Sequence, residues 1–430
     1  MPAISIALEP ARAPTALQKL VRLAARYSLS ALGPVSISAA HFLGAVLVLH
    51  TLPRLQFGLF SFVMTIVPFC VSAASALVGA PTIIGIRQRG HVDDAELATF
   101  QKANFALGLL VFAVVSASLL GSGMRLEASL LFGLYGALMS LRLLGRTYAY
   151  AVDSPARAAI SDAVYSVIVL AGLWALHFVD RIGMTNIAML FSLAALSSMA
   201  AFDRDYLRKQ FRRLGAGTLA AYAPVWRDLT RWSLVGVAAT ELTVNAHAYF
   251  VTFFSGPGAF ALLALGGLLM RPVSLVLSAF PDMERPIMAR AIGAGDLVRG
   301  FRAVKEFRMA GVAVLLVTIA LAAVLLFRFP QVVLKQGYDS HQALLIVAVW
   351  IAIMAIRVLR TPEAVFLQAA GAFQPLANAS LKSCAVSLVA TLVLLMAFGP
   401  IASLLGIVAG DLVLTVSIFS LMREWRLQHG

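Results

Sequence analysis

The sequence predicts an all-α polytopic membrane protein, with twelve transmembrane helices in two six-helix lobes around a central cavity. Three observations support this fold class: an apolar composition, twelve long apolar runs and a motif that recurs in both halves of the chain. Of 430 residues, 60% are hydrophobic and 13% are charged, whereas soluble proteins carry about 25% charged residues. This composition excludes disordered, collagen-like and soluble multidomain classes. The only two cysteines, Cys70 and Cys384, lie in apolar runs, so no disulfide framework or cysteine metal site is indicated.

A helix that crosses the hydrocarbon core of a bilayer needs roughly 20 mainly apolar residues. Twelve stretches meet this requirement, at residues 28–50, 58–85, 103–121, 128–151, 157–178, 184–202, 232–254, 258–281, 309–327, 342–369, 376–398 and 400–422. The first run has no cleavage-type pattern after it, so we interpret it as a retained span. We therefore expect a cytoplasmic N-terminal segment, an N-lobe, a basic cytoplasmic linker, a C-lobe and a cytoplasmic tail, at residues 1–27, 28–202, 203–231, 232–422 and 423–430.

The basic residues alternate strictly between the two sides of these spans. There are 34 Lys and Arg against 20 Asp and Glu, a net charge of +14. Both terminal segments and every second loop, with the adjoining helix ends, hold 24 of the basic residues, the other loops hold five, and five lie within spans. This distribution predicts that both termini are cytoplasmic. The basic loops are poor in aromatic residues, so we expect no nucleic-acid partner.

A short pattern recurs in the fourth span of each half. MSLRLLGRT at residues 139–147 matches MAIRVLRT at residues 354–361. A proline follows each copy, Pro155 and Pro375, and a charged residue lies seven positions later, Asp162 and Lys382. Because six spans is an even number, duplicated halves have the same orientation in the membrane, as in parallel-repeat transporters. Alternating access by rocking of one lobe against the other follows from this architecture.

Ionisable side chains inside a bilayer cost about 2.5–3.5 kcal/mol each on insertion scales, so they tend to face a partner or a cavity. The clearest set consists of five arginines and two acids: Arg142, Arg146, Arg271, Arg357, Arg360, Glu241 and Asp411. One interpretation is structural pairing of Glu241 with Arg271 and of Asp411 with Arg357. The other is a cationic cavity for an anionic substrate. Five bases against two acids leave a positive surplus, and arginine binds two phosphate oxygens at once.

Other polar residues within the spans have simpler interpretations. Glu241, Asn245 one turn further along the same helix face, and Asp411 are candidates for coupling transport to a proton or sodium gradient, and we expect no other cofactor and no metal. His41 and His247 are interpreted as packing residues. Asp162, Lys382 and Glu363 lie near span ends, where we expect them to be solvated. Prolines within spans, among them Pro272, are interpreted as kinks.

Four stretches resemble the Wzx-type lipid-linked oligosaccharide flippases, the polysaccharide transporter branch of the multidrug/oligosaccharidyl-lipid/polysaccharide (MOP) superfamily. PRLQFGLF at residues 53–60 and GPGAF at residues 256–260 are similar to the turns that lead into the second span of each half. FPDMERP at residues 280–286 and FLQAAGAFQP at residues 366–375 are similar to the ends of spans eight and ten.

The resemblance implies a multi-pass protein of the bacterial inner membrane that moves an undecaprenyl-diphosphate-linked oligosaccharide to the periplasmic leaflet. The product would be O-antigen, capsule or exopolysaccharide, and the partners would be the lipid-linked oligosaccharide, membrane lipids and glycan polymerase machinery. It also implies that Arg271 contacts phosphate. We expect Arg142, Arg146, Arg357 and Arg360 to join it. Two alternatives stay open: a multidrug/cation antiporter of the same superfamily, and a polytopic glycan polymerase or transferase, although no catalytic motif such as HExxH is present.

Overall fold

The computed structural model describes residues 16–82, 94–152, 154–202, 204, 206–208, 218–333 and 339–429. Within these ranges the chain is helical apart from its turns. The N-lobe consists of α1 (Ala16–Thr51), α2 (Arg54–Ala74, continued by the π-helical η1, Ser75–Gly79), α4 (Asp94–Gly121), α5 (Leu126–Ala151), α6 (Pro155–Phe178) and α7 (Met184–Ser198, followed by η2, Met199–Ala201). The C-lobe consists of α10 (Arg231–Phe254), α11 (Pro257–Leu269), α12 (Arg271–Gly293), α13 (Leu297–Arg328), α14 (Pro330–Val333), α15 (Ser340–Ala369), α16 (Phe373–Phe398) and α17 (Pro400–His429).

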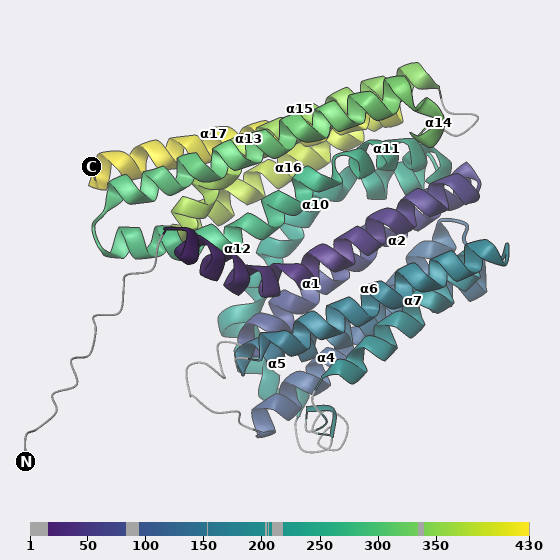
Figure 1. Ribbon diagram of the computed structural model, residues 1–430, viewed down its shortest axis with the longest axis horizontal. Coiled ribbons are helices and arrows are strands. Elements are labelled where there is room, and N and C mark those ends of the chain that lie inside the picture. The colour runs from purple at the N-terminus through teal and green to yellow at the C-terminus, as the bar shows by residue number, and fades with distance from the viewer. Residues whose placement is uncertain are drawn as a thin grey trace, which may run out of the picture.

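In Figure 1 the C-lobe lies above the N-lobe, and α1 and α2 pass between them. Nine of the helices in the described ranges are long and apolar enough to cross a membrane, and α11 with the first part of α12 forms a tenth span that is bent by 59°. The apolar part of α1 is shorter, at Val35–Thr51. The remaining predicted span, at residues 232–254, is α10, which carries Glu241, Asn245 and His247 on the wall of the cavity described below. The predicted two-lobed helical fold is confirmed.

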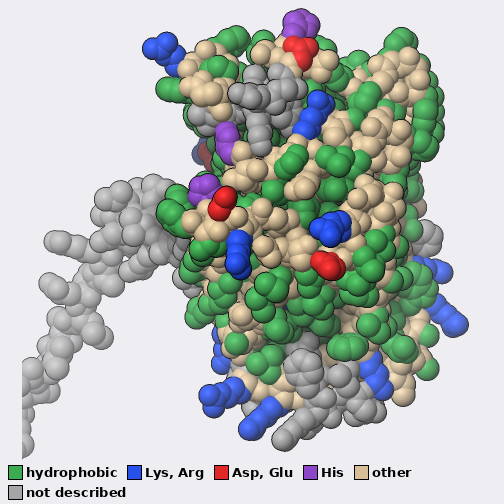
Figure 2. Space-filling model, turned by 90° about the vertical axis from the view of Figure 1, so that its right-hand side faces the viewer, with side chains coloured by type: hydrophobic (Ala, Val, Ile, Leu, Met, Phe, Trp, Pro, Cys, Tyr) green, Lys and Arg blue, Asp and Glu red, His purple; other side chains and the backbone are tan. Residues whose placement is uncertain are grey.

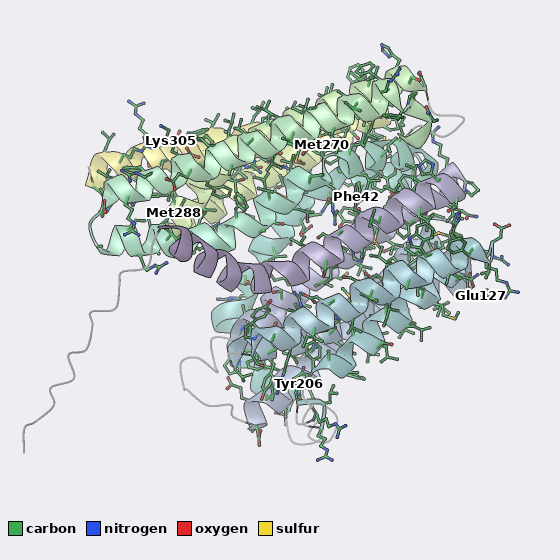
Figure 3. All side chains as sticks on the ribbon, viewed as in Figure 1. Phe42, Glu127, Tyr206, Met270, Met288 and Lys305 are labelled. Carbon is green, nitrogen blue, oxygen red and sulfur yellow. The ribbon has the colours of Figure 1, made fainter. Side chains whose placement is uncertain are left out.

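Several helices continue beyond the predicted apolar runs, and the longest extensions lie at one end of the bundle. α4, α13 and α17 extend past their apolar runs at residues 103–121, 309–327 and 400–422. We call this end the basic end, because the α12–α13 turn and the last turns of α17 place basic side chains there: Arg290, Arg299, Arg302, Arg423 and Arg426. Lys305 lies toward it in Figure 3, and Glu127 lies at the opposite end.

We call the opposite end the turn end, because the chain reverses there between α1 and α2, between α10 and α11 and between α16 and α17. Figure 2 views this end, where scattered charged side chains lie among hydrophobic ones and among uncharged side chains and backbone. The lobes are in direct contact here. The guanidinium Nε of Arg54, at the start of α2, donates to the carbonyl of Gly258 in α11 over 2.8 Å.

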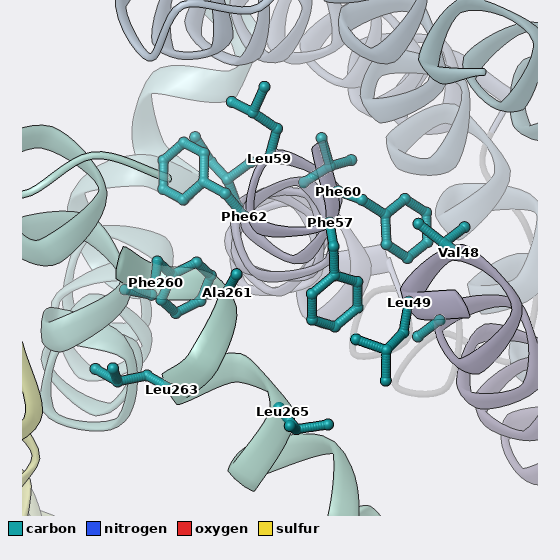
Figure 4. Packing of buried hydrophobic residues seen from close by; sticks show 14 of the residues in the cluster. Val48, Leu49, Phe57, Leu59, Phe60, Phe62, Phe260, Ala261, Leu263 and Leu265 are labelled. Carbon is teal, nitrogen blue, oxygen red and sulfur yellow. The ribbon is translucent and has the colours of Figure 1, made fainter. Parts of the chain in front are cut away.

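One hydrophobic core runs through both lobes where α2 packs against α11. Phe57 and Phe60 of α2 and Phe260 of α11 are at most 3% exposed, and Figure 4 shows α2 with α1 on one side and α11 on the other. Gly58 is what permits this approach. A Cβ atom at this position would lie within 1.8 Å of the carbonyl oxygen of Pro257. The lobes are therefore closed against each other at the turn end.

The duplication is visible in the burial pattern of matching helices. Buried Ala128, Phe132, Tyr135 and Arg142 of α5 recur at the same spacing in α15 as Ala343, Val347, Trp350 and Arg357. Buried positions of α6 likewise recur in α16, where Ser161, Asp162, Tyr165, Val169 and Leu173 are matched by Ser383, Cys384, Ser387, Thr391 and Leu395. Because buried positions repeat every three or four residues, this pattern fits more than one register of α6 against α16. The alignment of Asp162 with Lys382 therefore stays a prediction.

The connection between the lobes packs on the N-lobe. It contains η3 (Leu219–Tyr222), α9 (Ala223–Val225) and η4 (Trp226–Thr230). The phenol of Tyr222 donates to the carbonyl of Leu77 over 2.5 Å, and its ring contacts Phe100 of α4 edge-on. Burial raises the pKa of Tyr222, so the phenol keeps its proton and remains a donor. Residues 209–217 of the predicted basic linker lie outside the described residues.

Candidate functional site: a cavity between the lobes

The lobes enclose a cavity of about 360 Å³, lined by α1, α2, α10, α11, α12 and α15. This volume falls in the range of roughly 300–1,000 Å³ that is typical of small-molecule sites. The ionisable side chains on its wall are His41 of α1, Glu241 and His247 of α10, Arg271 of α12 and Arg357 of α15. Both lobes therefore contribute, and of the five arginines predicted to contact substrate, two line the cavity.

Arg271 stands where the eighth predicted span breaks. α11 ends at Leu269 and α12 begins at Arg271, with Pro272 at its first turn. Proline lacks an N–H and cannot continue the hydrogen-bonding pattern of a preceding helix, but its fixed φ suits the start of a new one. The sequence had suggested a simple kink at Pro272. The break instead turns the N-terminus of α12, with its free backbone N–H groups, and the Arg271 guanidinium toward the same cavity.

The predicted ion pair between Glu241 and Arg271 does not form. Glu241 instead accepts hydrogen bonds from Asn245 Nδ2 on its own helix, over 2.8 Å, and from Ser72 Oγ of the N-lobe, over 3.3 Å. Within the described part of the chain, Arg271 has no hydrogen bond or ion pair. Among the described residues, the cavity wall thus carries one carboxylate, which neutral groups of both lobes hold by hydrogen bonds, and one arginine without a counter-ion.

Arg357 and Arg360 share a single carboxylate in the C-lobe. Arg357 Nε donates to Asp411 Oδ2 over 2.8 Å, and Arg360 Nη1 donates to Asp411 Oδ1 over 2.7 Å. The predicted pairing of Asp411 with Arg357 is therefore confirmed, and Arg360 is included in it. Asp411 is fully buried, on α17. The Nη2 group of Arg357 is buried and has no hydrogen-bond partner in the described residues, so this arginine keeps donors that the ion pair does not use.

The N-lobe contains an equivalent cluster of two arginines and one aspartate. Its aspartate lies on α6, whereas the aspartate of the C-lobe cluster lies on α17. Arg142 Nη2 and Arg146 Nη2 of α5 contact the two oxygens of Asp162 over 2.5 and 2.8 Å. Arg142 is 1% exposed, also donates to Ser161 Oγ, and lies over the Tyr165 ring. Neither arginine lines the cavity. Asp162 is fully buried, so its expected solvation was wrong.

Glu363, also expected to be solvated, is buried and paired with Arg308. The expected solvation was wrong for Asp162 and Glu363 for the same reason. Their distance from the span ends was read from the sequence, whereas their solvation depends on which face of the helix they occupy. One feature of the sequence could have indicated that Asp162 is buried: Arg142 and Arg146 lie four residues apart, and Asp162 is the nearby carboxylate that can pair with both.

His41 links the cavity wall to the interior of the N-lobe. Its Nε2 is hydrogen-bonded to the Tyr165 phenol over 2.8 Å, and that phenol contacts the Tyr135 phenol over 3.0 Å. In the C-lobe, His247 packs against the rings of Phe260 and Trp350. Both histidines make the aromatic packing contacts expected of them, and both also line the cavity, which the sequence did not indicate.

Replacing Asp162 with asparagine should destabilise the protein by about 3–5 kcal/mol, because it leaves two buried or half-buried arginines without their shared counter-ion. The same loss is expected for Asp411→Asn. Thermal unfolding of the purified protein in detergent measures both effects as a lower Tm. Glu127→Gln, at an exposed position of the turn end, is the control and should leave Tm unchanged. An unaltered Tm in Asp162→Asn would show that the cluster contributes nothing to stability.

No family model and no curated protein matches the sequence. Solved structures match its fold over nearly the whole chain. An inward-facing multidrug-resistance MATE family transporter of the MOP superfamily gives a TM-score of 0.68 at 13% identity, covering 94% of this chain and 95% of that one. An outward-facing structure of a MATE family transporter gives 0.60 at 14% identity, over 95% and 96%.

A third similar structure is a MOP superfamily transporter from Pyrococcus furiosus. It gives a TM-score of 0.58 at 15% identity, covering 94% of this chain and 95% of that one. That protein is described as having a binding pocket of reverse polarity, which suggests a different function for it. The chain described here thus has the fold of MOP superfamily transporters, a multi-pass membrane fold with twelve helices in two lobes. The structures it resembles are transporters, not enzymes.

Proposed function

We propose that this protein is a flippase that moves an undecaprenyl-diphosphate-linked oligosaccharide across the bacterial inner membrane for surface polysaccharide synthesis. The observation that carries the proposal is Arg271, which faces the cavity at the break of a span and has no acidic partner in the described residues. An arginine desolvated without a counter-ion is costly, and a diphosphate supplies the missing charge. The broken helix adds backbone N–H donors that favour an anion.

The surroundings of Arg271 support the same ligand chemistry. Arg357 lines the cavity with a guanidinium nitrogen that lacks a partner, although its Nε is bound to Asp411. A volume of about 360 Å³ suits a head group, not a complete lipid-linked glycan. The lipid tail would then remain in the bilayer. Arg142, Arg146 and Arg360 would support the site through their ion pairs with Asp162 and Asp411.

Alternating access fits the closure of the lobes at the turn end. The head group would enter from the basic end, which the positive-inside rule places in the cytoplasm. It would leave after the contact between α2 and α11 at Gly58 has separated. The higher TM-score with the inward-facing relative, 0.68 against 0.60, is in line with this assignment.

The proposal is tested with the purified protein in proteoliposomes. A polyprenyl-diphosphate-linked sugar carrying a fluorescent group is added to one leaflet, and its protection from an impermeant quencher is followed. Transfer that needs the protein and is inhibited by free diphosphate supports the flippase. A lack of transfer, together with uptake of a cationic dye, would favour a cation antiporter instead. The second candidate has one observation in its favour, the Glu241 carboxylate on the cavity wall.

Glu241 is the proposed ion-coupling group, since it connects the lobes through Ser72 and carries the only carboxylate that the described residues place on the cavity wall. Glu241→Gln keeps hydrogen-bonding atoms but cannot bind or release a proton or hold a sodium ion. We expect this variant to transport at the same rate with and without an imposed gradient. Separate proton and sodium gradients across the proteoliposome identify the ion. Glu127→Gln should keep the gradient dependence of the unmodified protein, and so would Glu241→Gln if the coupling role were wrong.

A further inference from the structure

A polar recess lies on the outer surface of the C-lobe, away from the central cavity. It has a volume of about 480 Å³ and lies between α16 and α17. Gln374, Asn378 and Lys382 form one of its walls. They are spaced four residues apart, so they share one face of α16, and all three are exposed. Ser417 and Ser420 of α17 form the facing wall.

The matching helix of the N-lobe has no such polar wall among its described residues. At the same distances from the start of α6 as Gln374, Asn378 and Lys382 are from the start of α16, the residues are Ala156, Ile160 and Val164. All three are apolar, and Ile160 is 54% exposed. The common fold therefore does not require polar side chains on this face. Their presence in one lobe alone indicates a function specific to the C-lobe.

The polar groups of the recess have few partners within the protein. No side-chain hydrogen bond or ion pair joins Gln374, Asn378, Lys382 or Ser420 to any other described residue. Ser417 Oγ donates to the carbonyl of Val413 over 2.8 Å, which leaves its oxygen free to accept. The wall of α16 thus offers one ammonium and two amides, a set of N–H donors suited to an anionic oxygen group.

The position of the recess along the membrane normal matches the lipid head-group region at the basic end. α16 has 26 residues, so it is about 39 Å long, about 9 Å more than the hydrocarbon core. Its last turns are apolar and exposed up to Phe398, which places the surplus length at its beginning. The recess is therefore at the bilayer interface. Farther along the same face, Val386, Val389 and Val393 form an exposed apolar track toward the membrane centre.

We propose that this recess binds one anionic glycerophospholipid from the leaflet at the basic end. Lys382 and the Asn378 amide contact the phosphate, the serines of α17 face the glycerol region, and the acyl chains follow the valines of α16. The site is separate from the cavity, so it does not depend on which substrate is transported. The proposed ligand is a lipid of the membrane, because the polar groups lie beside an exposed apolar track.

Native mass spectrometry of the full-length protein tests this site. The protein is extracted with a mixture of phosphatidylglycerol and phosphatidylcholine, and the bound lipids are counted. We expect one phosphatidylglycerol per chain to be retained, and Lys382→Gln to weaken this binding about tenfold, the loss of one charge-assisted contact. Lys382→Val, which introduces the residue at the same position of α6, should weaken the binding in the same way. Lys305→Gln removes the same charge from an exposed position toward the same end and should change nothing.

Five results would overturn the proposal. Lys382→Gln could retain phosphatidylglycerol as the unmodified protein does, or Lys305→Gln could lose it equally, which would indicate general attraction to basic surface. Equal retention of phosphatidylcholine would remove the role of charge. Displacement of the lipid by millimolar inorganic phosphate would assign the recess to a free anion, and dimers lost on substitution of Lys382 would assign it to a second copy of the chain.

Discussion

Arg271→Glu is expected to abolish transport while the protein still folds and inserts. The substitution places a second carboxylate in a cavity that already contains Glu241, and it removes the one guanidinium there that lacks an ion-pair partner in the described residues. Losing one partner of a buried, charge-assisted contact costs about 2–5 kcal/mol, which is on the order of 30-fold or more in affinity. Because Arg271 has no ion pair to break, stability should change far less than in Asp162→Asn.

Transfer of the polyprenyl-diphosphate-linked sugar in proteoliposomes measures the effect. Arg271→Lys should recover part of the activity, since it restores the charge without the planar two-nitrogen contact. Lys305→Glu, a charge reversal outside the cavity, is the matched control and should transport normally. Undiminished transport by Arg271→Glu, with insertion verified, would show that the cavity arginine does not bind the substrate.

Gly58→Ala is expected to hold the lobes apart at the turn end. The new Cβ would lie within 1.8 Å of the Pro257 carbonyl oxygen, a backbone atom that cannot move aside without moving α11. Separation of α2 from α11 relieves this clash. The same motion opens the cavity at the turn end. The variant should therefore favour the turn-end-open state and lose transport, because a flippase has to close on each side in turn.

Spin labels at Leu55 of α2 and Phe254 of α10 measure this opening, since both positions are exposed near the turn end. Their distance distribution should shift to longer values in Gly58→Ala. Gly258→Ala is the control on the opposite side of the same contact, because its Cβ would meet nothing closer than 3.9 Å, from Leu55. If the distances in Gly58→Ala equal those of the unmodified protein, the contact is not the gate.

The succession of spans and the Asp411–Arg357 pair could be predicted from the sequence. Long apolar runs define spanning helices locally, and a buried arginine requires a nearby acid. The pairing of Asp162 with Arg142 and Arg146 could not be predicted in the same way. It depends on which face of α6 turns inward, and packing between helices decides this.

The sequence by itself determined the twelve helices, their duplication and the excess of arginine within the spans, because composition and periodicity act along the chain. Only the tertiary structure decided how those arginines are used. Four of the five share two buried carboxylates, Asp162 and Asp411, and Arg271 alone faces the cavity without a counter-ion among the described residues. That division follows from helix rotation and from the break before Arg271, both of which are set by packing between segments far apart in the chain.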